Sequence, residues 1–220
     1  AAPDFKIMWD NAYCVHHLTD THDVILNMLE ECRKAGHEDR ALMFCSLSKV
    51  TFPGAGAAAM AASRRNIDYI LKNMFPMIIS FDKLNQVRHI RFLKDMDGLA
   101  AHMEKHRALL EPKFRAVLAI LDEGLSGCGS IARWTKPNGG YFLSLYTLGG
   151  CAKRTVQLCR EAGVVLTDAG AAYPYGVDPQ DSNIRIAPSY PPLSDLILAM
   201  ELFALCVKIV SIDKLLAEMN

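Results

Sequence analysis

The sequence lacks the marks of several protein classes. Its 24 lysines and arginines balance 24 acidic residues, so the formal net charge is +0. No basic block therefore predicts binding to nucleic acid or to an anionic membrane. No apolar run approaches the roughly 20 residues that a membrane helix needs, and no signal peptide is recognisable. We expect a cytoplasmic protein without nucleic-acid or membrane partners.

Cysteine and histidine show no pattern of a metal site or a disulfide framework. The seven cysteines are odd in number and irregular in spacing, and no two are separated by two residues. Reduced thiols in a cytoplasm are the expected state. The histidines also lack ligand spacing, so we interpret them as packing or surface residues and expect no metal site: His16, His17, His89, His102 and His106.

Apolar periodicity predicts a parallel sheet early in the chain. Residues 5–9 predict a strand, residues 22–35 a helix and residues 41–44 a buried strand. This is the order of a βαβ unit, whose strands run parallel. Small residues at 57–62 predict another short strand, and residues 64–73 predict a helix that Ser63 caps.

The later part of the chain has a different texture. Long helices are expected from residue 82 onward, with a break at Asp97-Gly98 and a kink at Pro112. Short strands and helices follow, and a division near residue 95 separates the two parts. The expected strands are 131–134, 141–145, 164–166 and 183–187, and the expected helices are 151–162 and 194–217.

The stretch from Phe44 to Gly56 is the most informative. Lys49 follows the buried strand and stands at its carboxyl end, where open α/β sheets bind their ligands. Walled by apolar side chains, such a lysine should have a lowered pKa and could form a Schiff base with an aldehyde. A lysine that begins a surface loop is the alternative. Asp10, after the parallel strand, should share the same edge of the sheet.

Three short motifs in order give the chain a resemblance to a known family. Residues 9–13 (WDNAY) look like a D-x-x-Y motif, and residues 46–49 (SLSK) look like S-x-x-K. Residues 183–187 (NIRIA) look like a segment with a carboxylate-binding arginine. The chain thus resembles the fold type I pyridoxal phosphate-dependent aminotransferases. A bacterial aspartate aminotransferase subgroup, also called alanine-aminotransferase-like or MocR-like, resembles it over longer stretches: 48–56, 82–89, 137–142 and 181–192.

The resemblance implies an α/β fold that is half of a larger structure. Residues 1–95 would form the second half of a large cofactor-binding domain, with a mainly parallel sheet and flanking helices. Residues 96–220 would form a linking helix and a small α+β C-terminal domain. Family members are roughly twice this length, and their first half carries a phosphate loop and a ring-stacking aromatic. We therefore expect this chain alone to be inactive and the whole protein to be a homodimer.

The resemblance also implies pyridoxal 5′-phosphate as the cofactor and a role for each matching residue. Lys49 would bind the cofactor covalently and catalyse proton transfer. Many members place a phosphate-binding arginine where Gly56 or Ala57 stands here. The implied cofactor-binding residues besides Lys49 are Asp10 at the ring nitrogen, Tyr13 at the ring hydroxyl, and Ser46, Ser48, Lys83 and Asn85 at the phosphate. Arg185 and Tyr141 are the implied substrate-binding residues.

The activity implied is transamination between an amino acid, aspartate or glutamate, and a 2-oxo acid. Two other functions remain open, because a fold does not determine the reaction. One is a pyridoxal phosphate-dependent carbon–sulfur lyase. The other is an aminotransferase-like sensor domain of a transcription regulator.

Overall fold

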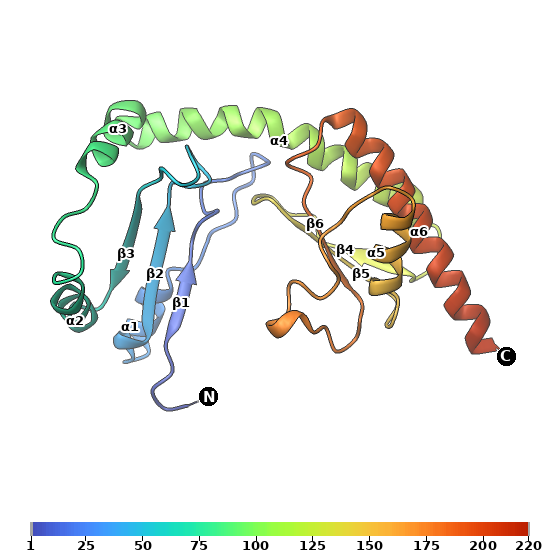
Figure 1. Ribbon diagram of the computed structural model, residues 1–220, viewed down its shortest axis with the longest axis horizontal. Helices are drawn as coiled ribbons and strands as arrows, with labels where there is room; N and C mark the ends of the chain where they lie inside the picture. The colour runs from blue at the N-terminus through green and yellow to red at the C-terminus, as the bar shows by residue number, and fades with distance from the viewer. Residues whose placement is uncertain (1, 220) are drawn as a thin grey trace. The chain divides into compact units, whose positions relative to one another are not determined.

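The computed structural model describes residues 2–219, which divide into two compact units (Figure 1). The first unit contains residues 2–17 and 21–105, and the second contains residues 18–20 and 106–219. Helix α4 (Met96–Leu125) contributes residues to both units. Within the described residues, no helix is long and apolar enough to cross a membrane, and no group of three or more metal-ligating side chains comes together.

The first unit is built on a three-stranded mixed sheet with the order β1-β2-β3. Strands β1 (Ile7–Asp10) and β2 (Ala41–Ser46) pair in parallel, as the βαβ pattern predicts. Strand β3 (Ala58–Ala62) pairs antiparallel to β2, with Ala58 opposite Ser46. The α/β class is confirmed, and the antiparallel β3 makes the sheet mixed.

Helix α1 (Met28–Lys34) lies between β1 and β2 in the chain and is shorter than predicted. The expected start at residue 22 is wrong, because Asn27 caps the helix by accepting from the backbone N–H of Glu30 at 3.1 Å. The apolar residues at 24–26 that suggested an earlier start lie outside the helix. Val24 is 98% exposed. A short 3₁₀ helix, Glu38–Arg40, precedes β2.

Helices α2 (Arg64–Met74) and α3 (Lys83–Leu93) follow the sheet. Ser63 caps α2 as predicted, and Asp82 caps α3 by accepting from Asn85 N at 3.0 Å. The break before α4 falls at Lys94, where φ is +64°, so the predicted break at Asp97-Gly98 is wrong. Gly98 lies in the first turn of α4, where it packs so closely on Leu93 O that no side chain fits.

The second unit contains an antiparallel sheet with the order β4-β5-β6. Its strands are β4 (Ala132–Trp134), β5 (Leu143–Thr147) and β6 (Asn183–Ile186). Because strand residues alternate between faces, Leu143, Leu145, Ile184 and Ile186 all lie on one face and are buried there. Arg185 therefore belongs to the opposite face.

Helices α5 (Ala152–Glu161) and α6 (Leu193–Met219), with the second half of α4, cover the buried face. Figure 1 shows α5 and α6 on the same side of this sheet. Fully buried Val117 and Leu121 from α4, Cys159 from α5, and Phe203 and Val207 from α6 form the core with the strands. A short 3₁₀ turn, Pro174–Gly176, precedes β6.

The strand predicted at 164–166 is absent. Gly163 takes φ +93° and ends α5, and Val164 N donates back to Cys159 O at 2.8 Å. This is a helix C-terminal motif in which a left-handed glycine lets the next residue bond to an earlier carbonyl. Val165 then projects into solvent and is 78% exposed, so the apolar run has no sheet partner.

Asp178 organises the loop that leads into β6. Its carboxylate, only 6% exposed, accepts hydrogen bonds from the backbone N–H groups of Gln180, Ser182 and Asn183 at 3.0, 2.8 and 2.8 Å. Burial alone raises the pKa of Asp178, but these hydrogen bonds outweigh it, so the pKa lies below its ordinary value.

We predict that Asp178→Ala lowers the thermal unfolding temperature at pH 7 by several degrees, because three backbone N–H donors, two of them buried, lose their acceptor. Since the folded-state pKa is lowered, the carboxylate stabilises the fold above the unfolded pKa, and this stabilisation is lost as pH falls below about 4. Unfolding at pH 7 and pH 3 measures both effects. The Asp178→Asn variant keeps an acceptor, so it should lose less stability at pH 7. Equal unfolding temperatures for wild type and Asp178→Ala would contradict the prediction.

Candidate functional site

The candidate site lies at the carboxyl edge of the parallel strand pair. Asp10 is the last residue of β1 and stands opposite Phe44 of β2. The next residue, Asn11, continues the ladder by donating from its N–H to Phe44 O at 2.8 Å. Strand β2 ends at Ser46, and Lys49 follows in a turn. The geometry therefore brings the segments that carry Asp10 and Lys49 to one edge.

Lys49 lies in a single helical turn after β2. The N–H groups of Val50 and Thr51 both donate to Leu47 O, at 3.0 and 2.9 Å. Val50 is buried under the turn and is only 1% exposed, whereas Lys49 is exposed. Residues 2–219 therefore do not form the expected apolar wall around Lys49.

Asp10 and Tyr13 lie in the loop after β1. Asp10 is exposed, and its Oδ1 accepts from Ala12 N–H at 3.0 Å, which fixes the carboxylate direction. Tyr13 is half-buried, and its ring meets the His16 ring edge to face with centroids 5.7 Å apart. The loop thus presents a carboxylate and a phenol beside the lysine turn.

Two serine hydroxyls converge at the end of β2. Ser46 Oγ donates to Ser48 Oγ at 2.8 Å and accepts from Ser48 N–H at 3.1 Å. Gly56 packs against them, since a Cβ there would come within 3.0 Å of both Ser48 N and Ser48 Oγ. Any side chain at position 56 would therefore displace Ser48, and glycine avoids this.

Helix α3 contacts the segment beside Ser46 and Ser48 through Asn85. Its Nδ2 donates to Gly56 O at 3.2 Å, while its Oδ1 is buried without a partner among the described residues. Lys83 is exposed in the first turn of the same helix. The structure thus connects Asn85 to the Ser46–Ser48 pair through Gly56, and it leaves Lys83 at the surface.

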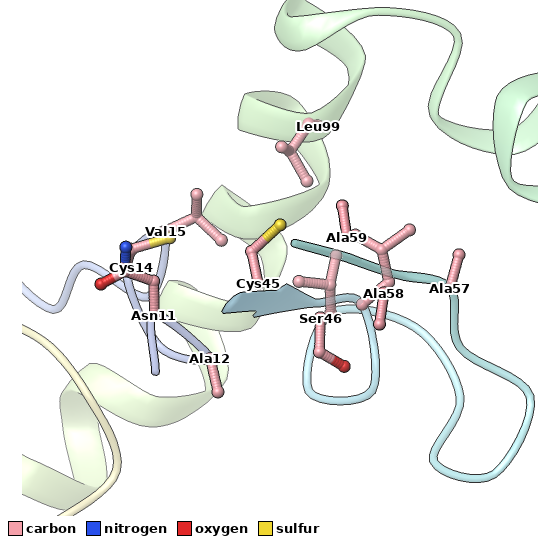
Figure 2. A pocket seen from close by; sticks show the side chains of 12 residues that line it. Asn11, Ala12, Cys14, Val15, Cys45, Ser46, Ala57, Ala58, Ala59 and Leu99 are labelled. Carbon is pink, nitrogen blue, oxygen red and sulfur yellow. The ribbon is translucent and has the colours of Figure 1, made fainter. Parts of the chain in front are cut away.

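An apolar cavity of about 340 Å³ lies beside the site, with Ser46 and Asn11 in its lining (Figure 2). Figure 2 shows Cys14 and Val15 on one side, three alanines on the other, and Cys45 between them. Burial raises the pKa of the Cys14 thiol and the proximity of Cys45 raises it further, so Cys14 is protonated at neutral pH. This cavity suits an apolar group and holds no reactive thiolate at Cys14.

Arg185 and Tyr141 belong to the second unit. The Arg185 guanidinium lies over the Phe142 ring, 4.7 Å from its centroid, and its buried Nε has no hydrogen-bond partner among residues 2–219. No acidic side chain pairs with it in that part of the chain.

Lys113 holds the loop after β6 by donating to the carbonyl oxygens of Ser189 and Pro191, both at 2.7 Å. Half-buried Tyr141 lies next to Phe142 in the chain.

Three histidines near Lys49 were missed by sequence reasoning. His16 Nε2 lies 3.0 Å from Lys49 O, His102 Nε2 lies 2.8 Å from Val50 O, and His89 Nε2 lies 2.7 Å from Thr51 Oγ1. His16 and His89 are buried, as the packing interpretation expects, and the contacts of all three with this turn are the part that the sequence did not indicate. Their spacing along the sequence carries no signal, because they come from a loop and two different helices.

A family model described as aspartate amino-transferase matches residues 1–219. An aspartate aminotransferase of Corynebacterium glutamicum is 44% identical over 207 residues, which are 94% of this chain and 48% of that protein. A protein of Mycolicibacterium smegmatis with an aminotransferase name is 47% identical over 218 residues, 99% of this chain and 51% of that protein. The chain spans about half the length of the curated relatives it matches.

Solved structures agree with this result. The crystal structure of an aspartate transaminase from Corynebacterium glutamicum has a TM-score of 0.93 at 42% identity, over 97% of this chain and 50% of that one. LysN, an α-aminoadipate aminotransferase from Thermus thermophilus complexed with N-(5′-phosphopyridoxyl)-L-leucine, has a TM-score of 0.72 at 20% identity, over 93% and 50% of the two chains. The second likeness shows the fold alone.

Proposed function

The chain belongs to the aspartate aminotransferase family, and from that premise we propose that the whole protein transfers an amino group from aspartate or glutamate to a 2-oxo acid with pyridoxal 5′-phosphate. The observation that carries the proposal is the placement of Lys49 just after β2, at the same sheet edge as Asp10. All the relatives reported above carry aminotransferase names, which favours transamination over the lyase and the sensor.

The residues at this edge fit the chemical groups of the cofactor. Lys49 Nζ offers an exposed amine to the aldehyde, and Asp10 offers a carboxylate to the ring nitrogen. Tyr13 would bind the ring hydroxyl. The Ser46 and Ser48 hydroxyls converge at 2.8 Å and would bind the phosphate, and Asn85 and Lys83 of α3 would support that end.

Bound pyridoxal phosphate supplies an electron-withdrawing ring that takes up the electron pair left when the substrate loses its α-proton. Asp10 would hold the proton on the ring nitrogen, and the hydrogen bond that its carboxylate accepts from Ala12 N–H keeps it in one direction. Lys49 Nζ would act as the general base that removes the proton from the substrate α-carbon. The exposed side chain of Lys49 and its hydrogen-bonded backbone suit this proton transfer.

Arg185 suits a carboxylate of the substrate. A guanidinium offers five N–H donors in a planar fork that matches a carboxylate with two parallel hydrogen bonds. Stacking on Phe142 fixes the plane without using those donors. We assign the substrate carboxylate to Arg185 and include Tyr141 in the substrate pocket.

The proposal extends to assembly and location. The relatives are about twice as long as this chain, and we propose that the part it does not span supplies a phosphate loop and a ring-stacking aromatic. Residues 1–95 would then complete a large domain with that part, and residues 96–220 would form the linking helix and small domain. We propose a cytoplasmic homodimer, and we expect the 220 residues alone to be inactive.

We predict that borohydride reduction of the whole protein with pyridoxal phosphate attaches the cofactor to Lys49, because the exposed amine forms the covalent link. Peptide mass spectrometry locates the attachment. Lys49→Ala should abolish it, whereas Lys72→Ala, an exposed lysine of α2, should leave it unchanged. Attachment to another lysine in the wild type would disprove the assignment.

Gly56→Ala should weaken cofactor binding, because the new methyl group pushes Ser48 away from the phosphate. Loss of one hydrogen bond to a charged group predicts a rise of about tenfold or more in the dissociation constant, measurable by fluorescence titration. Gly127→Ala is the matched control, since a Cβ there meets nothing within 4 Å. Equal affinities of the two variants would contradict the proposed role of Ser48 at the phosphate.

Arg185→Lys should raise KM for the amino acid about tenfold or more, because an ammonium cannot reproduce the two parallel hydrogen bonds of a guanidinium. Steady-state kinetics measure the change. Arg133→Lys is the control, since Arg133 also stacks on a ring in this sheet, 4.0 Å from the Tyr146 centroid. An unchanged KM in Arg185→Lys would show that the carboxylate binds elsewhere.

A further inference from the structure

Three consecutive residues of the lysine turn, Lys49 to Thr51, each form a hydrogen bond with a histidine side chain. Lys49 O and Val50 O are the acceptors for His16 and His102, and Thr51 Oγ1 is the partner of His89. These histidines come from the loop after β1, from α4 and from α3. All six residues belong to the first unit. Within the turn, Leu47 O accepts from the N–H groups of Val50 and Thr51 and from the Thr51 hydroxyl, whereas the carbonyl oxygens of Lys49 and Val50 accept from histidines.

The acceptors determine where the ring protons lie. A carbonyl oxygen only accepts, so Nε2 of His16 and Nε2 of His102 must carry protons and donate to the turn. In His89, Nδ1 lies 2.8 Å from Asn85 O and must donate there. His89 Nε2 then lies 2.7 Å from Thr51 Oγ1, and the same hydroxyl lies 3.2 Å from Leu47 O. Each histidine thus makes a directed hydrogen bond to the turn.

Burial makes two of these contacts structural anchors. His16 is 3% exposed and His89 is 5% exposed, and hydrogen bonds shielded from water are strengthened by the low local dielectric. His16 also packs its ring edge to face against Tyr13, with centroids 5.7 Å apart. One buried side chain therefore contacts both the backbone of Lys49 and the ring of Tyr13.

We propose that His16 and His102, through backbone carbonyl oxygens, and His89, through the Thr51 side chain, are positioning residues that hold the Lys49 turn and leave the lysine side chain exposed. This inference rests on the proposed function, in which Lys49 Nζ binds the cofactor and then carries a proton. A side chain that must leave and return cannot itself be held by strong contacts. Only its backbone can be fixed, and a displacement of about 1 Å can cost about a hundredfold in rate.

The test compares two substitutions of His16 in the holoenzyme. His16→Phe keeps a ring against Tyr13 and removes the N–H donor to Lys49 O, whereas His16→Gln keeps an amide donor at the position of Nε2. His16→Phe should lower kcat about tenfold, the effect of one net hydrogen bond, with KM for the amino acid unchanged. His16→Gln should recover most of the loss. His37→Phe is the control, because His37 is exposed and makes no side-chain cap to its helix.

A second readout does not depend on activity. Amide hydrogen exchange of the cofactor-free protein should show faster exchange at Val50 and Thr51 in His16→Phe, by about tenfold, and nearly wild-type exchange in His16→Gln. Exchange elsewhere in β1 and β2 should stay unchanged. Uniformly faster exchange would mean a general loss of stability and would overturn the proposal.

The outcomes separate the two proposals. If borohydride attaches no cofactor to Lys49 in the wild type, the proposed function fails, while the exchange comparison still decides whether the histidines hold the turn. Wild-type exchange and kcat in His16→Phe would overturn the positioning role, and so would equal damage in His16→Gln. If His16→Phe does not fold, His102→Phe and His102→Gln apply the same comparison to Val50 O.

Discussion

The parallel pairing of β1 with β2 is the constraint on which the candidate site depends. It places Asp10 opposite Phe44, so the loop after β1 and the turn after β2 emerge at one edge of the sheet. The antiparallel pairing of β3 then sets Ala58 opposite Ser46, and Leu47 N donates to Ala57 O at 2.8 Å. The segment between these strands must return to the same edge. Gly56 consequently packs on Ser48. The strand pairing alone thus brings together the loop after β1, the turn after β2 and the segment that leads into β3.

The sequence predicted this edge because its signals are local. A short apolar run followed by Ser46, Ser48 and Lys49 indicates a buried strand that ends at a polar loop. Two strands around a helix indicate a parallel pair, whichever residue begins the helix. The wrong start predicted for α1 left the predicted topology correct, because the Asn27 cap changes only where the helix begins. Element order survives such errors, whereas element ends depend on individual hydrogen bonds.

The contacts around Lys49 could not be predicted in the same way. His16, His89 and His102 reach the turn because a loop, α3 and α4 happen to pack around it, and no spacing in the sequence encodes that packing. The open exposure of Lys49 was also unexpected, because the apolar run before it gives no information on which neighbours cover its side chain. Both features are tertiary. The sequence indicates which residue types are present, and the packing decides which polar groups they satisfy.

The two candidate functional cations are held in opposite ways, and each way suits its proposed task. Lys49 is fixed through its backbone, by histidines that bond to the carbonyl oxygens of its turn, so its amine can move. Arg185 is fixed through its side chain, by the Phe142 ring beneath the guanidinium, so its donors stay in one plane. A group that would take a proton from the substrate and pass it on requires freedom at its tip. A group that must recognise a planar carboxylate requires a fixed tip, because two parallel hydrogen bonds form only when both planes agree. Where each side chain is held therefore fits the division of roles proposed for them.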